Sequence, residues 1–109
     1  MKTEFTKATQ HRPLGKAGAQ NIAAIGLGAM GMSKMYGASD DAESIATIHA
    51  ALDAGVNLID TGDFYGFGHN EMLIGQALKG RRDEAVLSVK FGALRSPDGG
   101  WSGADGHRR

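Results

Sequence analysis

The chain has 109 residues, a formal net charge of zero and no cysteine, and it contains no apolar run of transmembrane length. Neutral charge excludes the electrostatic attraction that draws basic proteins to nucleic acid and anionic membranes, and the lack of cysteine excludes disulfides and thiolate metal sites. We therefore expect one modest domain in the cytoplasm, with neither a nucleic-acid nor a membrane partner.

The first predicted elements are two short strands that form a β-hairpin. The first strand begins near Arg12, a turn follows at residues 15–18, and the second strand runs through residues 22–27. Residues 22–27 are apolar on both faces, which is typical of a strand covered on both sides, although periodicity alone leaves a buried helix open. Residues 28–39 follow as a loop rich in glycine, alanine and methionine.

A helix is predicted from Asp40 to Ala54. Asp40 can cap its first turn, with Glu43 three residues later, and Gly55 supplies the stop. The apolar residues expected in the core recur at helical spacing and are Ala42, Ile45, Ile48 and Leu52.

The next segments predict a strand over residues 56–59, a loop over 60–70, a helix over 71–79 and a further strand over 85–89. Gly80 ends the helix, whose expected core residues are Met72, Leu73, Ile74 and Leu78. Strands that alternate with helices through short connections imply parallel strands joined by right-handed crossovers. The polar, turn-rich residues 93–109 predict a loop or a disordered segment.

Three residues at or just beyond the expected strand ends carry a coherent chemistry: Asp60, Tyr65 and Lys90. A neutral tyrosine can give its proton to a developing alkoxide if a neighbouring cation stabilises the phenolate that it becomes. Lysine can be that cation, and a carboxylate beside it favours the charged ammonium form. Because active sites of parallel α/β folds form at the carboxyl ends of the strands, we expect the three side chains at one end of the sheet.

Residues 55–66, the pair Asn70-Glu71 and residues 88–92 together closely resemble the aldo-keto reductase family, NADPH-dependent enzymes built on an eight-stranded α/β barrel. The resemblance covers about residues 12–100. It implies an α/β fold of the (β/α)8 TIM-barrel family, with an N-terminal β-hairpin and only the first three or so βα units present. Residues 1–109 would then be the truncated N-terminal part of such a barrel domain, which we expect to be inactive alone.

By this resemblance, Tyr65 is the proton donor, and Asp60 and Lys90 are its supporting ion pair. The residues expected to contact the nicotinamide of NADPH are Gly28, Ala29, Met30 and Asp60, with Tyr36-Gly37 following on the same loop. The implied substrate is a small aldehyde or ketone. The histidine that the family carries at the end of the fourth strand has no counterpart, since His107 follows a glycine-rich loop rather than an apolar strand.

Other interpretations remain open at this point. Residues 26–31 fit the dinucleotide fingerprint Gly-x-Gly-x-x-Gly, although a Rossmann site requires a helix that opens there. A metal could use oxygen and imidazole ligands from Asp60, Asp63, His69 and Glu71, although the family resemblance gives no metal role. A non-catalytic nucleotide-binding regulatory member of the fold, or a non-functional gene fragment, would also fit the sequence.

Overall fold

A computed structural model describes residues 10–16, 20–34 and 39–107 of the chain. Short 3-10 helices are labelled η. The elements in chain order are β1 (His11–Leu14), β2 (Gln20–Ala23), β3 (Leu27–Gly28), η2 (Met30–Ser33), α1 (Asp41–Asp53), β4 (Leu58–Gly62), η3 (Tyr65–Gly68), α2 (His69–Ala77), η4 (Arg82–Glu84), β5 (Val86–Lys90), β6 (Ala93–Arg95) and β7 (Trp101–Ala104).

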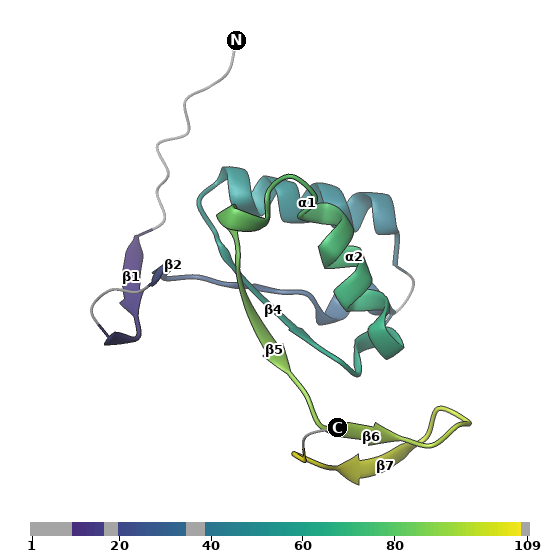
Figure 1. Cartoon of the computed structure of the whole chain (residues 1–109). Coiled ribbons are helices and arrows are strands. Elements are labelled where there is room, and N and C mark those ends of the chain that lie inside the picture. Colours follow the sequence, from purple (N-terminus) through teal and green to yellow (C-terminus); the bar gives the residue numbers. More distant parts are fainter. Residues whose placement is uncertain (1–9, 17–19, 35–38, 108–109) are drawn as a thin grey trace.

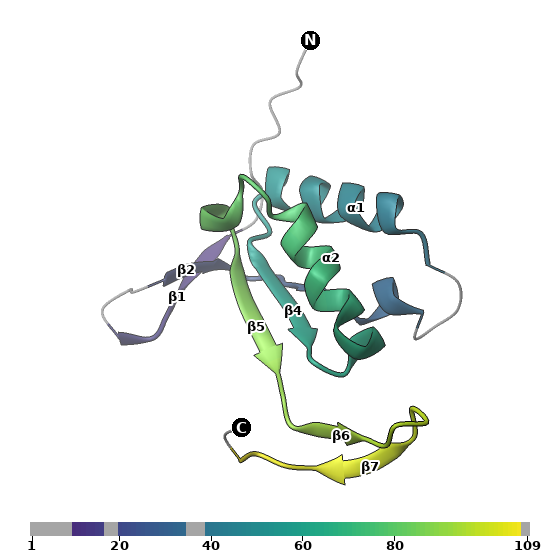
Figure 2. The same cartoon turned by 45° about the vertical axis from the view of Figure 1, so that its right-hand side comes forward.

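The central feature is a parallel sheet with the strand order β3-β4-β5. Ile59 of β4 pairs with Leu27 of β3 on one side and with Leu87 of β5 on the other. Helix α1 connects β3 to β4, and α2 connects β4 to β5, so that both helices pack on the same side of the sheet (Figures 1 and 2). The expected α/β fold with parallel strands and helical crossovers is confirmed.

The hydrophobic core lies between this sheet and the two helices. On β4, Ile59 and Thr61 are buried against the helices, whereas Asp60 between them points to the opposite face, as the alternation along a strand requires. The core cluster consists of Ala29, Ile48, Leu52, Ile59, Ile74, Ala77, Leu78 and Ala85. The expectation of a core position is wrong for two residues, since Ala42 is exposed and Met72 is 78% exposed.

The ends of α1 follow the predicted signals. The Asp40 carboxylate accepts a hydrogen bond from the Glu43 N–H at 3.2 Å, and Gly55 has a φ of +92° just after the helix. Helix α2 begins two residues earlier than predicted, at His69, because Gly68 with a φ of +92° turns the chain directly into it. Gly80 has a φ of +79°, as expected for a residue that ends a helical segment.

Two predicted strands differ from the observed ones. The single strand expected over residues 22–27 is two strands, because β2 pairs antiparallel with β1 whereas β3 pairs parallel with β4. At the bend, Gly26 lies so close to Leu58 that an added Cβ would be 3.2 Å from its side chain. The strand expected over residues 56–59 begins two residues and ends three residues later than predicted, since β4 is Leu58–Gly62.

The expectation of a loop or disordered segment over residues 93–109 is wrong for residues 93–104, which form the antiparallel hairpin β6–β7. The Ser96 N–H donates to the Gly100 carbonyl at 2.9 Å, and the Gly100 N–H donates to the Asp98 carboxylate at 2.9 Å. Polar side chains therefore build the turn, and the short strands carry no apolar periodicity that the sequence could reveal. The hairpin lies beyond the carboxyl end of β5 (Figure 2).

Some sequence predictions fall outside the described residues. Residues 17–18 belong to the predicted turn of the first hairpin, and Tyr36-Gly37 to the predicted cofactor loop. The described part of that loop contains the short η2 helix, where only a loop was expected.

Candidate active site

Asp60, Tyr65 and Lys90 meet at the carboxyl end of the parallel sheet. Asp60 lies in β4 rather than after it, which corrects the expectation that it closes the strand, whereas Lys90 is the last residue of β5 as predicted. Asp60 is in register with Ser88, and Lys90 lies two residues further along the same strand. Asp60 and Lys90 therefore point to the same face of the sheet.

The three side chains are in contact. The Lys90 ammonium donates to the Asp60 carboxylate, and its nitrogen lies 5.3 Å from the centre of the Tyr65 ring. Tyr65 begins η3 and is 4% exposed, with the Phe64 ring packed edge-on at a centroid distance of 4.7 Å. The arrangement thus places one cation beside both a carboxylate and a buried phenol.

The electrostatics of the pair follow from this contact. The hydrogen bond from Lys90 lowers the pKa of Asp60, with partial burial acting in the opposite direction. The bond to Asp60 raises the pKa of Lys90, and the nearby Tyr65 raises it further. Both charged side chains are more than a third exposed, so solvent screens their attraction, but at neutral pH both remain charged.

Asp63 and Gly62 fix the backbone around Lys90. The Asp63 N–H donates to the Lys90 carbonyl at 3.0 Å, and its carboxylate accepts from the Gly92 N–H at 3.2 Å. Gly62 pairs with Lys90, and a Cβ added to it would lie 3.2 Å from the Phe64 ring. The loop that carries Tyr65 is therefore tied to the end of β5.

The segment expected to face the cofactor lies next to Asp60. Gly28 is in register with Asp60, and an added Cβ at Gly28 would have no heavy atom within 4 Å, so its backbone faces open space. Ala29 is fully buried, and its N–H donates to the Asp60 carbonyl at 3.0 Å. Met30 opens the η2 helix.

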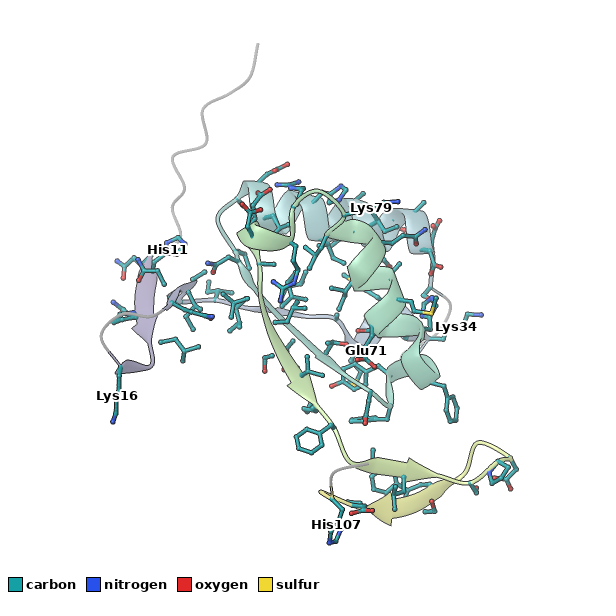
Figure 3. All side chains as sticks on the ribbon, in the orientation of Figure 1. His11, Lys16, Lys34, Glu71, Lys79 and His107 are labelled. Carbon is teal, nitrogen blue, oxygen red and sulfur yellow. The ribbon has the colours of Figure 1, made fainter. Side chains whose placement is uncertain are left out.

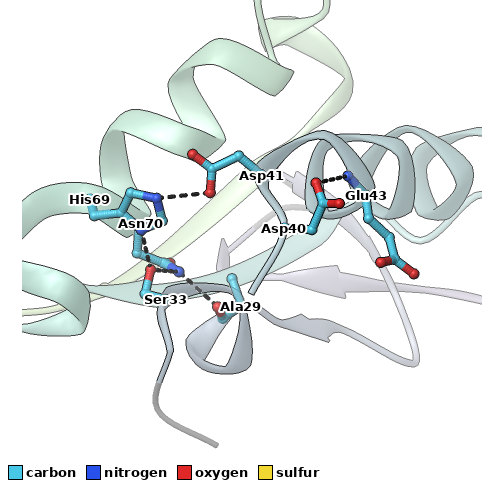
Figure 4. A network of polar contacts seen from close by, with 7 residues as sticks. All are labelled: Ala29, Ser33, Asp40, Asp41, Glu43, His69 and Asn70. Carbon is cyan, nitrogen blue, oxygen red and sulfur yellow. Dashed lines mark hydrogen bonds and ion pairs between the residues drawn. The ribbon is translucent and has the colours of Figure 1, made fainter. Parts of the chain in front are cut away.

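A buried network of hydrogen bonds holds residues 29–33 in place, and the sequence did not predict it (Figure 4). The Asn70 side-chain amide donates to the Ala29 carbonyl at 2.7 Å and to the Ser33 hydroxyl at 2.9 Å. The Thr61 hydroxyl donates to the Asn70 side-chain oxygen at 2.6 Å. The pair Asn70-Glu71 stood out in the sequence, but nothing there indicated which groups Asn70 binds.

The network continues to the surface through an imidazole. The Ser33 hydroxyl lies 2.8 Å from His69 Nδ1, and His69 Nε2 lies 3.0 Å from the Asp41 carboxylate. These contacts connect the η2 helix to the first residues of α1 and α2. The partners lie 28 and 36 residues apart in the sequence, so no local spacing could have indicated them.

The structure does not support the Rossmann alternative. Residues 26–31 lead only into the four-residue η2, and the next α-helix begins at Asp41. A dinucleotide fingerprint requires a helix that opens on its last glycines. The pyrophosphate site of a Rossmann fold is therefore missing from these residues.

The candidate metal ligands also separate. His69 contacts Ser33 and Asp41, while Asp60 contacts Lys90. Within residues 10–16, 20–34 and 39–107, no group of three or more histidine or acidic side chains is placed to hold a metal ion.

Lys79 lies at the end of the sheet where β5 begins, and His107 lies by the β6–β7 hairpin at the opposite end (Figure 3).

Comparison with known proteins identifies the family. The sequence profile of the Aldo/keto reductase family matches residues 24–108. The chain is 42% identical over 90 residues to the aldo-keto reductase yakc (NADP+) of Schizosaccharomyces pombe, an alignment that covers 81% of this chain and 26% of that protein. The chain therefore belongs to the aldo-keto reductase family.

Solved structures agree with this assignment. The holo form of the aldo-keto reductase AKR11C1 from Bacillus halodurans superposes with a TM-score of 0.71 at 32% identity, covering 86% of this chain and 30% of that one. An aldo-keto reductase from Klebsiella pneumoniae in complex with NADPH gives a TM-score of 0.63 at 32% identity, and the match covers 74% of this chain and 27% of that one.

These comparisons confirm the fold class expected from the sequence, the (β/α)8 barrel of the family. The chain spans about a quarter to a third of the length of the relatives that it matches. In the described part of the chain, no helix combines the length and apolar character needed to cross a membrane.

Proposed function

We propose that this chain contributes the proton-donating part of an NADPH-dependent reductase that converts small aldehydes or ketones to alcohols. The observation that carries the proposal is the contact of the Lys90 ammonium with both the Asp60 carboxylate and the buried Tyr65 ring. Family membership supports the reaction class. The absence of cysteine agrees with a cytoplasmic setting, which is part of the same proposal.

Tyr65 is the proposed general acid. The proton that its phenol gives to the substrate oxygen leaves a phenolate next to the Lys90 ammonium. Asp60 keeps that ammonium charged, because its hydrogen bond raises the pKa of Lys90. Tyr65 is 4% exposed, so most of its side chain is shielded from solvent, whereas the Lys90 side chain beside it is partly exposed.

The residues proposed to hold the nicotinamide are Gly28, Ala29, Met30 and Asp60. NADPH supplies the hydride of the reduction when it is bound. The open space at Gly28 fits the close approach of a flat ring to the backbone, and the hydrogen bond from Ala29 to the Asp60 carbonyl holds that backbone next to the ion pair. We expect turnover only when this segment is part of a barrel of the length found in its relatives.

Grafting the segment into a complete barrel tests this function. Residues 24–107 of this chain would replace the matching part of the Bacillus halodurans enzyme, and aldehyde-dependent oxidation of NADPH would be measured. We expect the graft to be active and its Tyr65→Phe variant to lose about 10²–10⁴-fold in kcat with little change in NADPH affinity, because only the proton transfer is removed.

The 109-residue chain is assayed beside the graft. We expect no turnover from the isolated chain. A Tyr65→Phe graft that retains full activity would contradict the role of Tyr65. NADPH binding without turnover in both the graft and its variant would instead favour a nucleotide-binding regulatory protein.

A further inference from the structure

Asn70 is fully buried, and each of its side-chain polar atoms has a partner. Its side-chain nitrogen carries two hydrogens, which go to the Ala29 carbonyl at 2.7 Å and to the Ser33 hydroxyl oxygen at 2.9 Å. Its side-chain oxygen accepts from the Thr61 hydroxyl at 2.6 Å. A buried amide with all of these bonds made is held in one place and one orientation, since a buried polar group that loses its partner is left unsatisfied at a free-energy cost.

With a neutral His69 ring, the hydrogens in the network have one consistent arrangement. The Asp41 carboxylate is an acceptor, so His69 Nε2 carries the hydrogen and, in the neutral ring, His69 Nδ1 is an acceptor. The Ser33 hydroxyl therefore donates to His69 Nδ1, and its oxygen is left to accept from Asn70. A reversed amide would place its oxygen against Ala29 and Ser33, neither of which has a hydrogen to offer it.

Ala29 is consequently held at both of its peptide groups. Its N–H donates to the Asp60 carbonyl at 3.0 Å, and its carbonyl accepts from Asn70 at 2.7 Å. These two bonds fix the peptide planes on either side of Ala29 relative to the strand that carries Asp60. The Ala29 methyl group is buried, so the segment cannot turn over without opening the core.

We propose that Asn70 is the positioning residue of the nicotinamide-binding segment, because it sets the backbone of residues 28–30 at a fixed place beside Asp60. This inference rests on the proposed function for its cofactor. Asn70 acts through the backbone of Ala29 and is not among the groups that exchange a proton with substrate. Its loss would displace a binding surface while the Asp60, Tyr65 and Lys90 contacts stay in place.

The test is the Asn70→Asp substitution in the 109-residue chain. Aspartate has nearly the same shape but no hydrogen to donate at neutral pH, so its oxygens would face the Ala29 carbonyl and the Ser33 oxygen. The Asn57→Asp variant is a matched control, because the Asn57 amide also bridges two backbone groups, accepting from the Ala23 N–H and donating to the Asn21 carbonyl, away from the site.

Two readouts are measured on both variants, amide hydrogen exchange by NMR and NADPH binding by fluorescence titration. For Asn70→Asp we expect exchange at Ala29 to rise at least tenfold relative to Ile59 and Ile74, and the Kd for NADPH to rise at least tenfold. For Asn57→Asp we expect neither change. A uniform rise in exchange at Ile59 and Ile74 as well as Ala29, or an unchanged Ala29, would overturn the proposal.

The two proposals fail in distinguishable ways. If the wild-type chain does not bind NADPH, cofactor binding by this chain is refuted, while the selective exchange at Ala29 still decides the positioning role. If Asn70→Asp does not fold, the proposal is tested on the wild-type chain. We expect a measurable NMR coupling across the hydrogen bond between the Asn70 side-chain nitrogen and the Ala29 carbonyl carbon, and its absence would overturn the proposal.

Discussion

At the scale of single residues, the candidate site depends on how one ammonium group is shared between a carboxylate and a phenol ring. The Lys90 side chain is 47% exposed and that of Asp60 is 39% exposed, so the ion pair itself contributes little to folding, about 0.2–1 kcal/mol. Its larger effect is on charge state, because each partner shifts the pKa of the other toward the ionised form.

Replacing Lys90 with methionine should return the pKa of Asp60 toward its ordinary value. A lowered folded-state pKa stabilises the protein above the ordinary pKa of aspartate, and this contribution disappears as the pH falls through the lowered value. Wild type should therefore be more stable than Lys90→Met at neutral pH, and the difference should vanish in acid.

An NMR titration of the Asp60 carboxyl carbon and denaturant unfolding at several pH values measure both effects. Lys79→Met serves as the control, since Lys79 lies at the opposite end of the sheet and should leave Asp60 unchanged (Figure 3). Identical Asp60 midpoints in wild type and Lys90→Met would show that the ion pair does not form in solution.

Residue type and strand position predicted that Asp60, Tyr65 and Lys90 would lie together, and the structure brings their side chains into contact, while their catalytic roles stay a prediction. The same reasoning could not find the hydrogen bonds of Asn70 and Ser33. The bonds of Asn70 to Ala29 and Ser33 join residues that are 41 and 37 positions apart, and only the crossover geometry brings them together. A buried amide leaves no mark in composition or periodicity.

At the scale of elements, the tight η3 turn is what brings Tyr65 and His69 to their places. Gly66 lies inside it with a φ of +62°, and a Cβ there would be 3.0 Å from the His69 Cβ and 3.1 Å from the Ser33 Cβ. The turn therefore requires glycine for two independent reasons, its backbone conformation and its close packing.

Gly66→Ala should consequently destabilise the fold by about 1–3 kcal/mol, measured by denaturant unfolding. Gly75→Ala is the matched control, because Gly75 lies in α2 with an ordinary φ and no heavy atom within 4 Å of an added Cβ. In an exposed helix position alanine should stabilise by about 0.5–1 kcal/mol. Equal effects of the two substitutions would show that η3 is not formed as described.

Helices were the elements that the sequence predicted best. The Asp40 cap, the Gly55 stop and the spacing of Ile48 and Leu52 all act within a few residues, and the structure has them as predicted. The limits of the strands were predicted less well, because they depend on pairing with residues that are distant in the sequence. The bend at Gly26 packs closely against Leu58, and the β6–β7 hairpin depends on a turn built from polar side chains, so neither could be located from local apolar patterns.

At the scale of the whole molecule, the sheet has an open edge. Among the described residues, β5 pairs with β4 on one side and with no strand on the other. Beside it, a cavity of about 440 Å³ is lined by residues of α2 and β5, including Ile74, Leu87 and Val89. An unpaired strand next to an apolar cavity favours association with another chain.

We therefore expect the 109-residue chain to self-associate through β5, with an average mass in sedimentation equilibrium that rises with concentration above that of the monomer. Val89→Lys should reduce the association, because Val89 is 46% exposed at this edge and a lysine there would have to lose its hydration in the contact. Met72→Lys is the control, since Met72 is 78% exposed on α2 and is not among the residues that line the cavity.

If both lysine variants reduce the mass equally, the association reflects general surface hydrophobicity and not the β5 edge. A wild-type chain that stays monomeric at all concentrations would show that the edge does not drive association.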